Sequence, residues 1–370
     1  MGFAIGILIL VVGLLFAIGL HELGHLVPAK RFGVKVPQYF IGFGPTLWST
    51  RRGETEYGVK AIPLGGFVRL AGMYPAARTD TSPPLDRHGR LTLVEEARAA
   101  SREDLGPGEE HRDFASLSVP KKLAVMFGGP LMNWLLALVL LLVVFVGLGT
   151  GTATTRIQSI SECLPEVGVT ECAADAAPSP AHEAGFQLGD RVTHWNGVPV
   201  DEWTELTEAI RTGPASAYPV EILRDGQAHT LTVTPALIDR PVFDDAGQVV
   251  LEDGEPVLER VPFVGVGPAF ELVRKGPGEA VQAWWEGTGA TFGVIATVPV
   301  QLWNTTVSLF SPDSEGGGRS VISVVGVGAI AGEIGGAASE EYTLAMRTVD
   351  MLGLLASLNL ALFAFNMIPL

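Results

Sequence analysis

The first 29 residues, MGFAIGILILVVGLLFAIGLHELGHLVPA, decide the fold, because only three of their side chains can ionise. A helix of about 28 residues is roughly 42 Å long at 1.5 Å per residue, which exceeds the roughly 30 Å hydrocarbon core of a bilayer. The three ionisable side chains are those of His21, Glu22 and His25, in the last third of the stretch. We therefore predict a membrane-spanning helix over residues 1–28 with ionisable groups inside the bilayer.

Two further stretches have the length and composition of membrane spans. Residues 123–155 and 351–370 contain no charged side chain, and about 20 predominantly apolar residues are enough for one crossing as a helix. We place these spans at residues 121–150 and 350–370. The first stretch lacks the basic start and the A-x-A site of a secretory signal peptide, so we expect it to remain in the protein.

The charged residues are distributed unevenly along the chain. Residues 29–122 carry 15 basic and 11 acidic side chains, whereas residues 150–350 carry 10 basic and 28 acidic ones. Cytoplasmic segments have an excess of Lys and Arg near the span ends, so we expect residues 29–122 inside the cell and residues 150–350 outside. A net charge of −15 excludes a nucleic-acid partner that is bound by phosphate neutralisation.

The segments between the spans differ in composition. Residues 29–72 combine glycines with an alternating pattern, which predicts a membrane-associated β-hairpin, and the polar residues 73–120 predict a mobile cytoplasmic loop. Residues 156–238 contain strand, Asn-Gly turn and helix patterns of a compact α/β domain, which residues 239–275 extend with short strands. The apolar, tryptophan-containing residues 276–345 are typical of amphipathic helices at a membrane interface.

His21, Glu22 and His25 form an H-E-x-x-H motif. Residues four apart share one face of a helix, so both imidazoles can reach one metal ion while Glu22 accepts a proton from bound water. Zinc suits such ligands, and a catalytic zinc site keeps one position for water. The alternative, polar boundary residues without a metal, costs roughly 2.5–3.5 kcal/mol per charged group. The depth of the motif indicates that water and substrate meet within the bilayer.

Five short motifs follow one another along nearly the whole chain. They are His21-Glu22-Leu23-Gly24-His25, Ile41-Gly42-Phe43-Gly44-Pro45, Ile62-Pro63-Leu64-Gly65-Gly66-Phe67-Val68, Gly129-Pro130 with Asn133, and Asn366-Met367-Ile368-Pro369-Leu370. In this order they resemble the site-2 proteases, the zinc intramembrane metalloproteases, and among these the bacterial regulators of sigma factors. The resemblance implies a membrane α-helical fold with three spans here and a fourth beyond residue 370. It also implies a membrane-associated β-hairpin and an extracytoplasmic α/β PDZ-like domain.

The resemblance assigns functions to single residues. It implies that His21 and His25 bind Zn²⁺ and that Glu22 is the catalytic base, near the cytoplasmic side. The family's third ligand is the aspartate of an N-x-x-P-x-x-x-L-D-G pattern, which would come a few residues after Leu370. The resemblance further implies that Asn366 holds the substrate backbone near the metal.

A second set of residues is predicted to bind substrate. Asn359 lies two helical turns before Asn366 and shares its helix face, although helix–helix hydrogen bonding is the alternative for both asparagines. The segment Glu56–Arg69 resembles the family's membrane-dipping hairpin, whose strand edge would pair with an unwound substrate. The predicted substrate-binding residues are Asn359, Asn366, Gly42, Gly44, Tyr57, Val59, Gly65 and Gly66.

The predicted extracytoplasmic domain offers three possible functions. Residues 184–192 resemble a stretch of PDZ domains, which implies either a filter for trimmed substrates or a docking site for a terminal carboxylate. A plain spacer is the third possibility. Cys163 and Cys172 lie on the oxidising side, where they form either a disulfide or two buried thiols.

Taken together with the resemblance, these patterns predict a zinc metalloendopeptidase of the inner (plasma) membrane. Its expected substrates are single-span membrane proteins of the anti-sigma-factor type, first cut outside the membrane by an upstream site-1 protease. The alternative is a catalytically silent membrane scaffold that binds partners through its PDZ-like domain. The absence of a third zinc ligand from the native gene would favour the scaffold.

Overall fold

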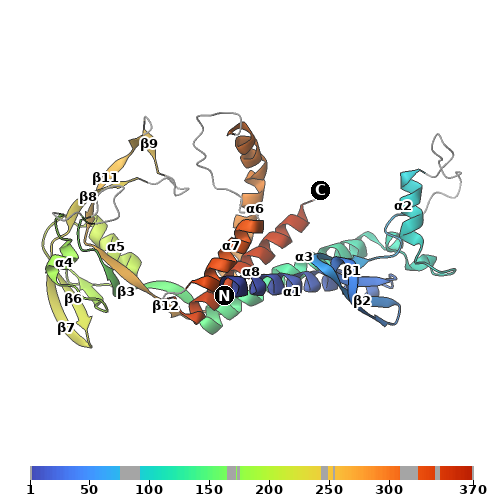
Figure 1. Ribbon diagram of the computed structural model, residues 1–370, viewed down its shortest axis with the longest axis horizontal. Helices are drawn as coiled ribbons and strands as arrows, with labels where there is room; N and C mark the ends of the chain where they lie inside the picture. The colour runs from blue at the N-terminus through green and yellow to red at the C-terminus, as the bar shows by residue number, and fades with distance from the viewer. Residues whose placement is uncertain are drawn as a thin grey trace. The chain divides into compact units, whose positions relative to one another are not determined.

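The computed structural model describes residues 2–75, 92–164, 172, 176–242, 249–252, 255–308, 324–337 and 342–368. The chain forms two compact units, of which the first comprises Met1–Gly149 with Arg274–Leu370 and the second comprises Thr150–Val273. The first unit contains the long apolar helices and the H-E-x-x-H motif, and the second is mostly β-sheet (Figure 1).

Three described helices of the first unit are long and apolar enough to cross a membrane. They are α1 (Gly2–Arg31), α3 (Val119–Leu142) with its π-helical continuation η3 (Val143–Leu148), and α8 (Leu344–Met367). The three predicted spans are therefore confirmed as candidate membrane helices, although α8 begins ahead of the predicted residue 350. Figure 1 shows α1 and α3 running side by side.

Glycines let α1 approach its neighbours closely. A Cβ atom at Gly24 would lie 2.2 Å from the Gly128 carbonyl oxygen of α3, and one at Gly128 would lie 2.0 Å from the Gly24 carbonyl oxygen. Near the start of α1, a Cβ atom at Gly6 would lie 2.0 Å from the carbonyl oxygen of Ala331 in α7 (Val324–Gly336). Small residues provide such close packing between membrane helices, where no hydrophobic effect drives association.

The long helix α6 (Pro277–Ser308) packs on the other helices through aromatic side chains. Trp284 lies on Trp134 of α3, with ring centroids 4.0 Å apart, and its Nε1 donates to the Trp134 carbonyl oxygen at 2.9 Å. Further along, Phe292 makes an edge contact with Phe363 of α8. These contacts attach the first half of α6 to the helix bundle, and its interfacial position stays a prediction.

Strands β1 (Gln38–Arg52) and β2 (Thr55–Arg69) pair antiparallel near the C-terminal end of α1 (Figure 1). Residues 38–41 pair twice, with residues 56–59 on one side and with residues 66–69 on the other, because β2 bends back around them. The bends use glycines with positive φ angles, namely Gly42, Gly44 and Gly65. The association of this hairpin with a membrane stays a prediction.

The segment predicted as a mobile loop, residues 73–120, contains regular structure and is corrected accordingly. Arg102 pairs with the buried carboxylate of Asp113, and Lys35 beyond α1 pairs with Glu109. A polar composition is typical of disorder, but the first ion pair joins two parts of the segment and the second joins it to the residues that follow α1. Its elements are α2 (Leu93–Arg102), η1 (Glu110–Arg112) and η2 (Phe114–Ser116), and residues 76–91 lie outside the described residues.

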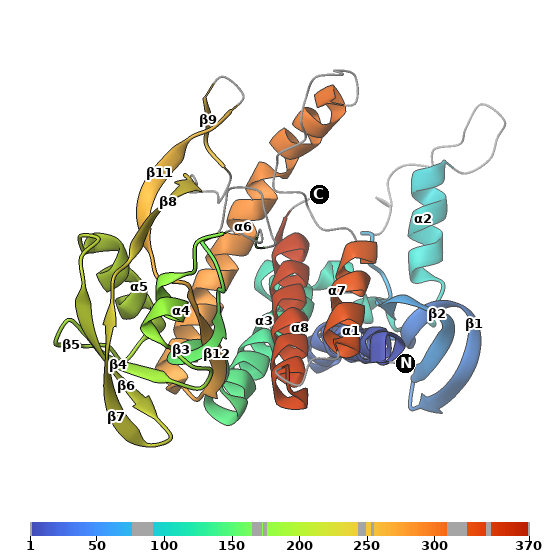
Figure 2. The ribbon, with the colours of Figure 1, turned by 60° about the vertical axis from the view of Figure 1, so that its left-hand side comes forward.

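The second unit is built on a six-stranded sheet with the order β12-β3-β4-β6-β7, in which β5 pairs with β4 (Figure 2). Two short strand pairs, β8 with β11 and β9 with β10, complete the unit. The elements are β3 (Thr150–Ile160), α4 (Pro180–Ala184), β4 (Arg191–Trp195), β5 (Val198–Pro199), α5 (Trp203–Thr212), β6 (Tyr218–Arg224), β7 (Gln227–Val233), β8 (Ala236–Pro241), β9 (Leu251–Glu252), β10 (Glu255–Pro256), β11 (Leu258–Phe263) and β12 (Val266–Val273).

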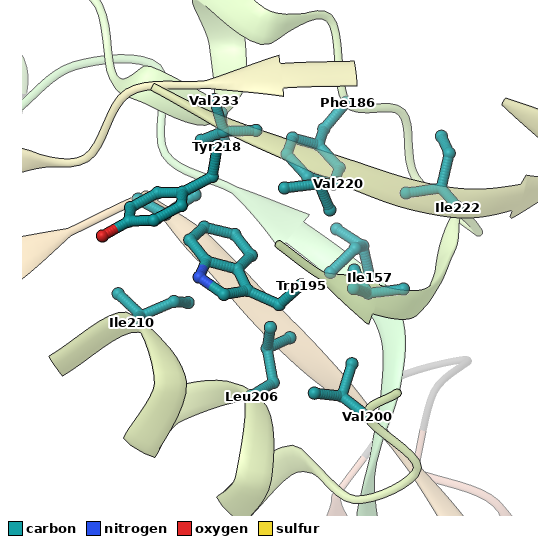
Figure 3. Packing of buried hydrophobic residues seen from close by; sticks show 13 residues of the cluster. Ile157, Phe186, Trp195, Val200, Leu206, Ile210, Tyr218, Val220, Ile222 and Val233 are labelled. Atoms are coloured by element: carbon teal, nitrogen blue, oxygen red, sulfur yellow. The ribbon is translucent and has the colours of Figure 1, made fainter. Parts of the chain in front are cut away.

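Alternating apolar residues of the sheet and one face of α5 form the core of this unit. Figure 3 shows the Trp195 indole between Leu206 of α5 and Tyr218 of β6. The helical spacing of Leu206 and Ile210 and the period-two pattern of β6 predict this arrangement.

Residues 239–273, predicted as a β extension of the domain, belong to the same compact unit as residues 150–238. Strand β12 pairs along β3, the first strand of the unit, so the end of the segment closes the sheet at its beginning. The paired residues of β3 and β12 are more than a hundred positions apart, so no local sequence pattern predicts that these strands pair. Cys163 and Cys172 form a disulfide in this unit, with Cα atoms 5.9 Å apart.

Candidate metal and catalytic site

The two histidines of the motif converge on one point beside α1. They lie one helical turn apart, and their Nε2 atoms are 3.2 Å from each other. The ring planes are nearly perpendicular, with centroids 4.9 Å apart. Both Nε2 lone pairs are therefore directed to a common position, as the four-residue spacing predicts.

A backbone carbonyl of α3 orients the second histidine. Nδ1 of His25 donates to the Val125 carbonyl oxygen at 2.7 Å. This hydrogen bond assigns the proton to Nδ1 and leaves the Nε2 lone pair free for a metal, as is usual for metal-binding histidines. The His25 ring also packs on Gly129, where a Cβ atom would lie 2.2 Å from Nε2. Helix α3 thus supplies both the hydrogen bond and the space that the His25 ring requires.

The two imidazoles fit a zinc ion. Two nitrogens that each lie roughly 2.0–2.1 Å from a tetrahedral metal are separated by about 3.3–3.4 Å, which is close to the 3.2 Å between the Nε2 atoms of His21 and His25. Nδ1 of His21 is buried and has no hydrogen-bond partner among the described residues. The described residues contain no group of three or more His, Cys, Asp and Glu side chains that could hold a metal.

The side chain of Glu22, on α1, faces the β1–β2 hairpin. A Cβ atom at Gly66 of β2 would lie 3.0 Å from Glu22 Cγ and 3.0 Å from the Phe40 carbonyl oxygen, so only glycine fits there without displacement. The backbone amide of Val68 faces the Glu22 carboxylate. The Glu22 side chain therefore lies against Gly66 and Val68 of β2, so this strand of the hairpin is next to the H-E-x-x-H motif.

The sequence analysis missed Tyr39 of β1, which joins the hairpin to α1. Its hydroxyl donates to the Gly19 carbonyl oxygen at 2.7 Å. Burial, together with the nearby Glu22 and Tyr57 side chains, raises the pKa of the Tyr39 phenol above its usual value. Tyr39 therefore remains a hydrogen-bond donor at neutral pH. A single tyrosine in a strand carries no sequence signal for this contact.

The predicted substrate-binding residues of the hairpin fall into two groups. Only Gly66 meets the catalytic motif, through the contact with Glu22. Tyr57 accepts a hydrogen bond from Lys30 Nζ at 3.0 Å, and the side chain of Val59 is exposed. The glycines Gly42, Gly44 and Gly65 pack against hairpin residues, namely Lys60, Ile62 and Phe43.

The two asparagines of α8 differ in their surroundings. Asn359 is 1% exposed, its Nδ2 donates to the Leu355 carbonyl oxygen at 2.8 Å, and its Oδ1 has no described partner. Asn366 is exposed, and its Nδ2 donates to the Leu362 carbonyl oxygen at 2.7 Å. Both of these hydrogen bonds stay within α8, and helix–helix hydrogen bonding remains the alternative for both asparagines. Their functions in substrate binding stay predictions.

Comparison with known proteins identifies the family. The model of Peptidase family M50 matches residues 9–370. The zinc metalloprotease Rip1 of Mycobacterium tuberculosis is 33% identical to this chain, over all of the chain and 83% of Rip1. Rip1 of Mycolicibacterium smegmatis is 31% identical over the same shares. The zinc metalloprotease RasP of Geobacillus kaustophilus is 30% identical over 58% of this chain and 59% of RasP.

These matches confirm the predicted family, the peptidase activity and zinc as the cofactor. The long apolar helices agree with an integral membrane protein. The chain belongs to Peptidase family M50.

Proposed function

We propose that this protein hydrolyses peptide bonds of single-span membrane proteins within the bilayer, with His21 and His25 as zinc ligands and Glu22 as the general base. The observation that carries the proposal is the convergence of the two Nε2 atoms, 3.2 Å apart, beside Glu22 on a candidate membrane helix. Zinc held by His21 and His25 would lower the pKa of a bound water to about 7 and would polarise the scissile carbonyl. The third ligand that the family resemblance implies is an aspartate.

Glu22 is the proposed general base and general acid of the reaction. Its carboxylate takes the proton from the attacking water and returns it to the nitrogen of the cleaved peptide bond, as a single base and acid. The contact between Gly66 and Glu22 Cγ supports this function, since it keeps the carboxylate at the hairpin. The hydrogen bond from His25 to Val125 holds the neighbouring ligand in place while the proton moves.

The hairpin is the proposed substrate platform. A helical substrate must unwind, because its carbonyls are otherwise engaged in i→i−4 hydrogen bonds. An extended segment can then add to a strand edge, where main-chain hydrogen bonds present the peptide bond. The position of Gly66 against Glu22 supports β2 as that platform, and the exposed side chain of Asn366 is the proposed contact from α8.

We further propose that the second unit docks the freed end of a substrate that has already been cut outside the membrane. A groove of about 400 Å³ lies between α5 and the β8–β11 pair. Arg211 and Arg240 line it, together with Phe263 and Val264, and neither arginine has a carboxylate partner among the described residues. Arg240 lies over the Phe263 ring, and Glu259 also lines the groove. Two guanidinium groups without an ion pair among the described residues suit a terminal carboxylate that follows apolar side chains. In this proposal the substrates are of the anti-sigma-factor type, and an upstream site-1 protease makes the first cut.

The test uses the complete protein in membranes with a tagged single-span reporter. Glu22→Gln should abolish the discrete product while the protein still binds zinc, and a zinc chelator should abolish the product of the wild type. Glu96→Gln is the matched control, because Glu96 is exposed on α2 away from the motif. Unchanged cleavage by Glu22→Gln would refute the proposal.

A further inference from the structure

Helices α1 and α3 run antiparallel, and their contacts set a register between them. Gly24 meets Gly128, and His25 meets both Val125 and Gly129. One helical turn before His25 on α1 is His21, and one turn after Gly129 on α3 is Asn133. In antiparallel helices these two steps lead in the same direction, so His21 and Asn133 face each other. The polar groups that face the His21 ring from α3 are the Gly129 backbone and the Asn133 side chain.

Both facing residues carry a buried polar atom without a partner. Asn133 is 1% exposed, and its Oδ1 has no hydrogen-bond partner among the described residues. The same is true of Nδ1 of His21. Buried polar atoms are almost always paired in proteins, and within a membrane no bulk water replaces a missing partner. One atom is a potential donor and the other is an acceptor, so each provides what the other lacks.

The other histidine shows what a metal ligand needs at this position. Nδ1 of His25 donates to the Val125 carbonyl oxygen, which fixes both the tautomer and the ring angle. His21 requires an equivalent acceptor for its Nδ1 proton if its Nε2 is to remain free for the metal. Among the groups of α3 that face the ring, Asn133 supplies the side-chain oxygen, and this Oδ1 is buried with no other partner among the described residues.

We propose that Asn133 is a positioning residue of the metal site, whose Oδ1 accepts the Nδ1 proton of His21 and holds Nε2 toward the metal. This inference rests on the proposed function, since it takes His21 as a ligand. Helix α3 would then orient both ligands, His25 through the Val125 carbonyl and His21 through the Asn133 amide. Removal of a partner that orients a ligand typically weakens metal affinity about 10–100-fold.

The test measures zinc affinity of the complete protein in detergent by competition with a chromophoric chelator. Asn133→Leu keeps the size of the side chain but removes the acceptor, and it should weaken zinc binding about 10–100-fold. Asn133→Asp keeps an oxygen at the same position and should restore most of the affinity. Thr155→Val is the matched control, because Thr155 is equally buried and its hydroxyl also has no partner among the described residues, but it lies on β3 of the second unit. It should leave the zinc affinity unchanged.

A second measurement reports the tautomer of His21 directly. Nitrogen-15 NMR of His21 in the wild-type protein should show the Nδ1-protonated tautomer, and in Asn133→Leu it should show a mixture of tautomers. An Nε2-protonated His21 in the wild type would overturn the inference, as would Asn133→Leu with unchanged zinc affinity. A wild-type protein that binds no zinc would instead refute the proposed function, and with it this inference.

Discussion

The close crossing of α1 and α3 makes Gly24→Ala a sharp test of how the site is held together. The new Cβ atom would lie 2.2 Å from the Gly128 carbonyl oxygen, whereas ordinary contacts begin at 3.4 Å. A backbone carbonyl in a helix cannot rotate away, so the helices must separate locally by about 1 Å. A separation of this size would break the 2.7 Å hydrogen bond from His25 to Val125.

The expected effect on catalysis is large. Misplacing a catalytic group by about 1 Å costs roughly 10²-fold in rate, so Gly24→Ala should lower the initial rate of reporter cleavage about 100-fold. Zinc affinity should fall as well, because His25 loses the carbonyl that orients it. The assay compares initial rates at equal protein levels in membranes, with the zinc content measured on the same samples.

Gly353→Ala is the matched control for this prediction. Gly353 also lies in a candidate membrane helix, α8, but a Cβ atom there would meet nothing within 4 Å. The control should cleave the reporter at the wild-type rate. If Gly24→Ala also cleaved at the wild-type rate with full zinc content, the close approach of the helices would not be what positions the histidines.

Three further predictions follow from the same structure. Gly66→Ala should reduce the cleavage rate without lowering zinc affinity, because its Cβ atom would displace Glu22 but not the ligands; a parallel loss of zinc would contradict this. Asp190→Asn should destabilise the second unit by about 1.5–3 kcal/mol, measured by hydrogen exchange, since it weakens the hydrogen bonds between the buried Asp190 carboxylate and the partly exposed Arg224; wild-type exchange rates would contradict it. Burial raises the pKa of Asp190, but hydrogen bonds from Arg224 and the Gln187 amide outweigh burial and lower it overall. The unit should therefore keep this stability at neutral pH and lose it only as the pH falls below the ordinary range of an aspartate; a loss at higher pH would contradict the assignment.

Much of this site could be predicted from local sequence. The four-residue spacing of His21 and His25 fixes their common helix face, and three long apolar stretches give the three candidate spans. The helical spacing of Leu206 and Ile210 also predicts the shared face that α5 buries in the second unit. In each case the cause lies within a few helical turns or one hairpin.

The remaining features depend on contacts between distant segments. The Val125 carbonyl that orients His25 is a backbone atom, so no residue type marks it. Asn133 opposes His21 only because Gly24 and Gly128 set the register of two helices. Likewise, the order of residues 92–117 depends on ion pairs such as Lys35 with Glu109, which the polar composition of the segment conceals.

Zinc content and reporter cleavage, measured together on the purified complete protein, test most directly whether the motif on α1 is a catalytic metal site. The wild type should bind zinc stoichiometrically and cleave the reporter. His21→Ala and His25→Ala should each lose zinc and activity, whereas Glu22→Gln should keep zinc and lose activity. Full zinc content in either histidine variant, or cleavage by Glu22→Gln, would contradict the assignment of these three residues.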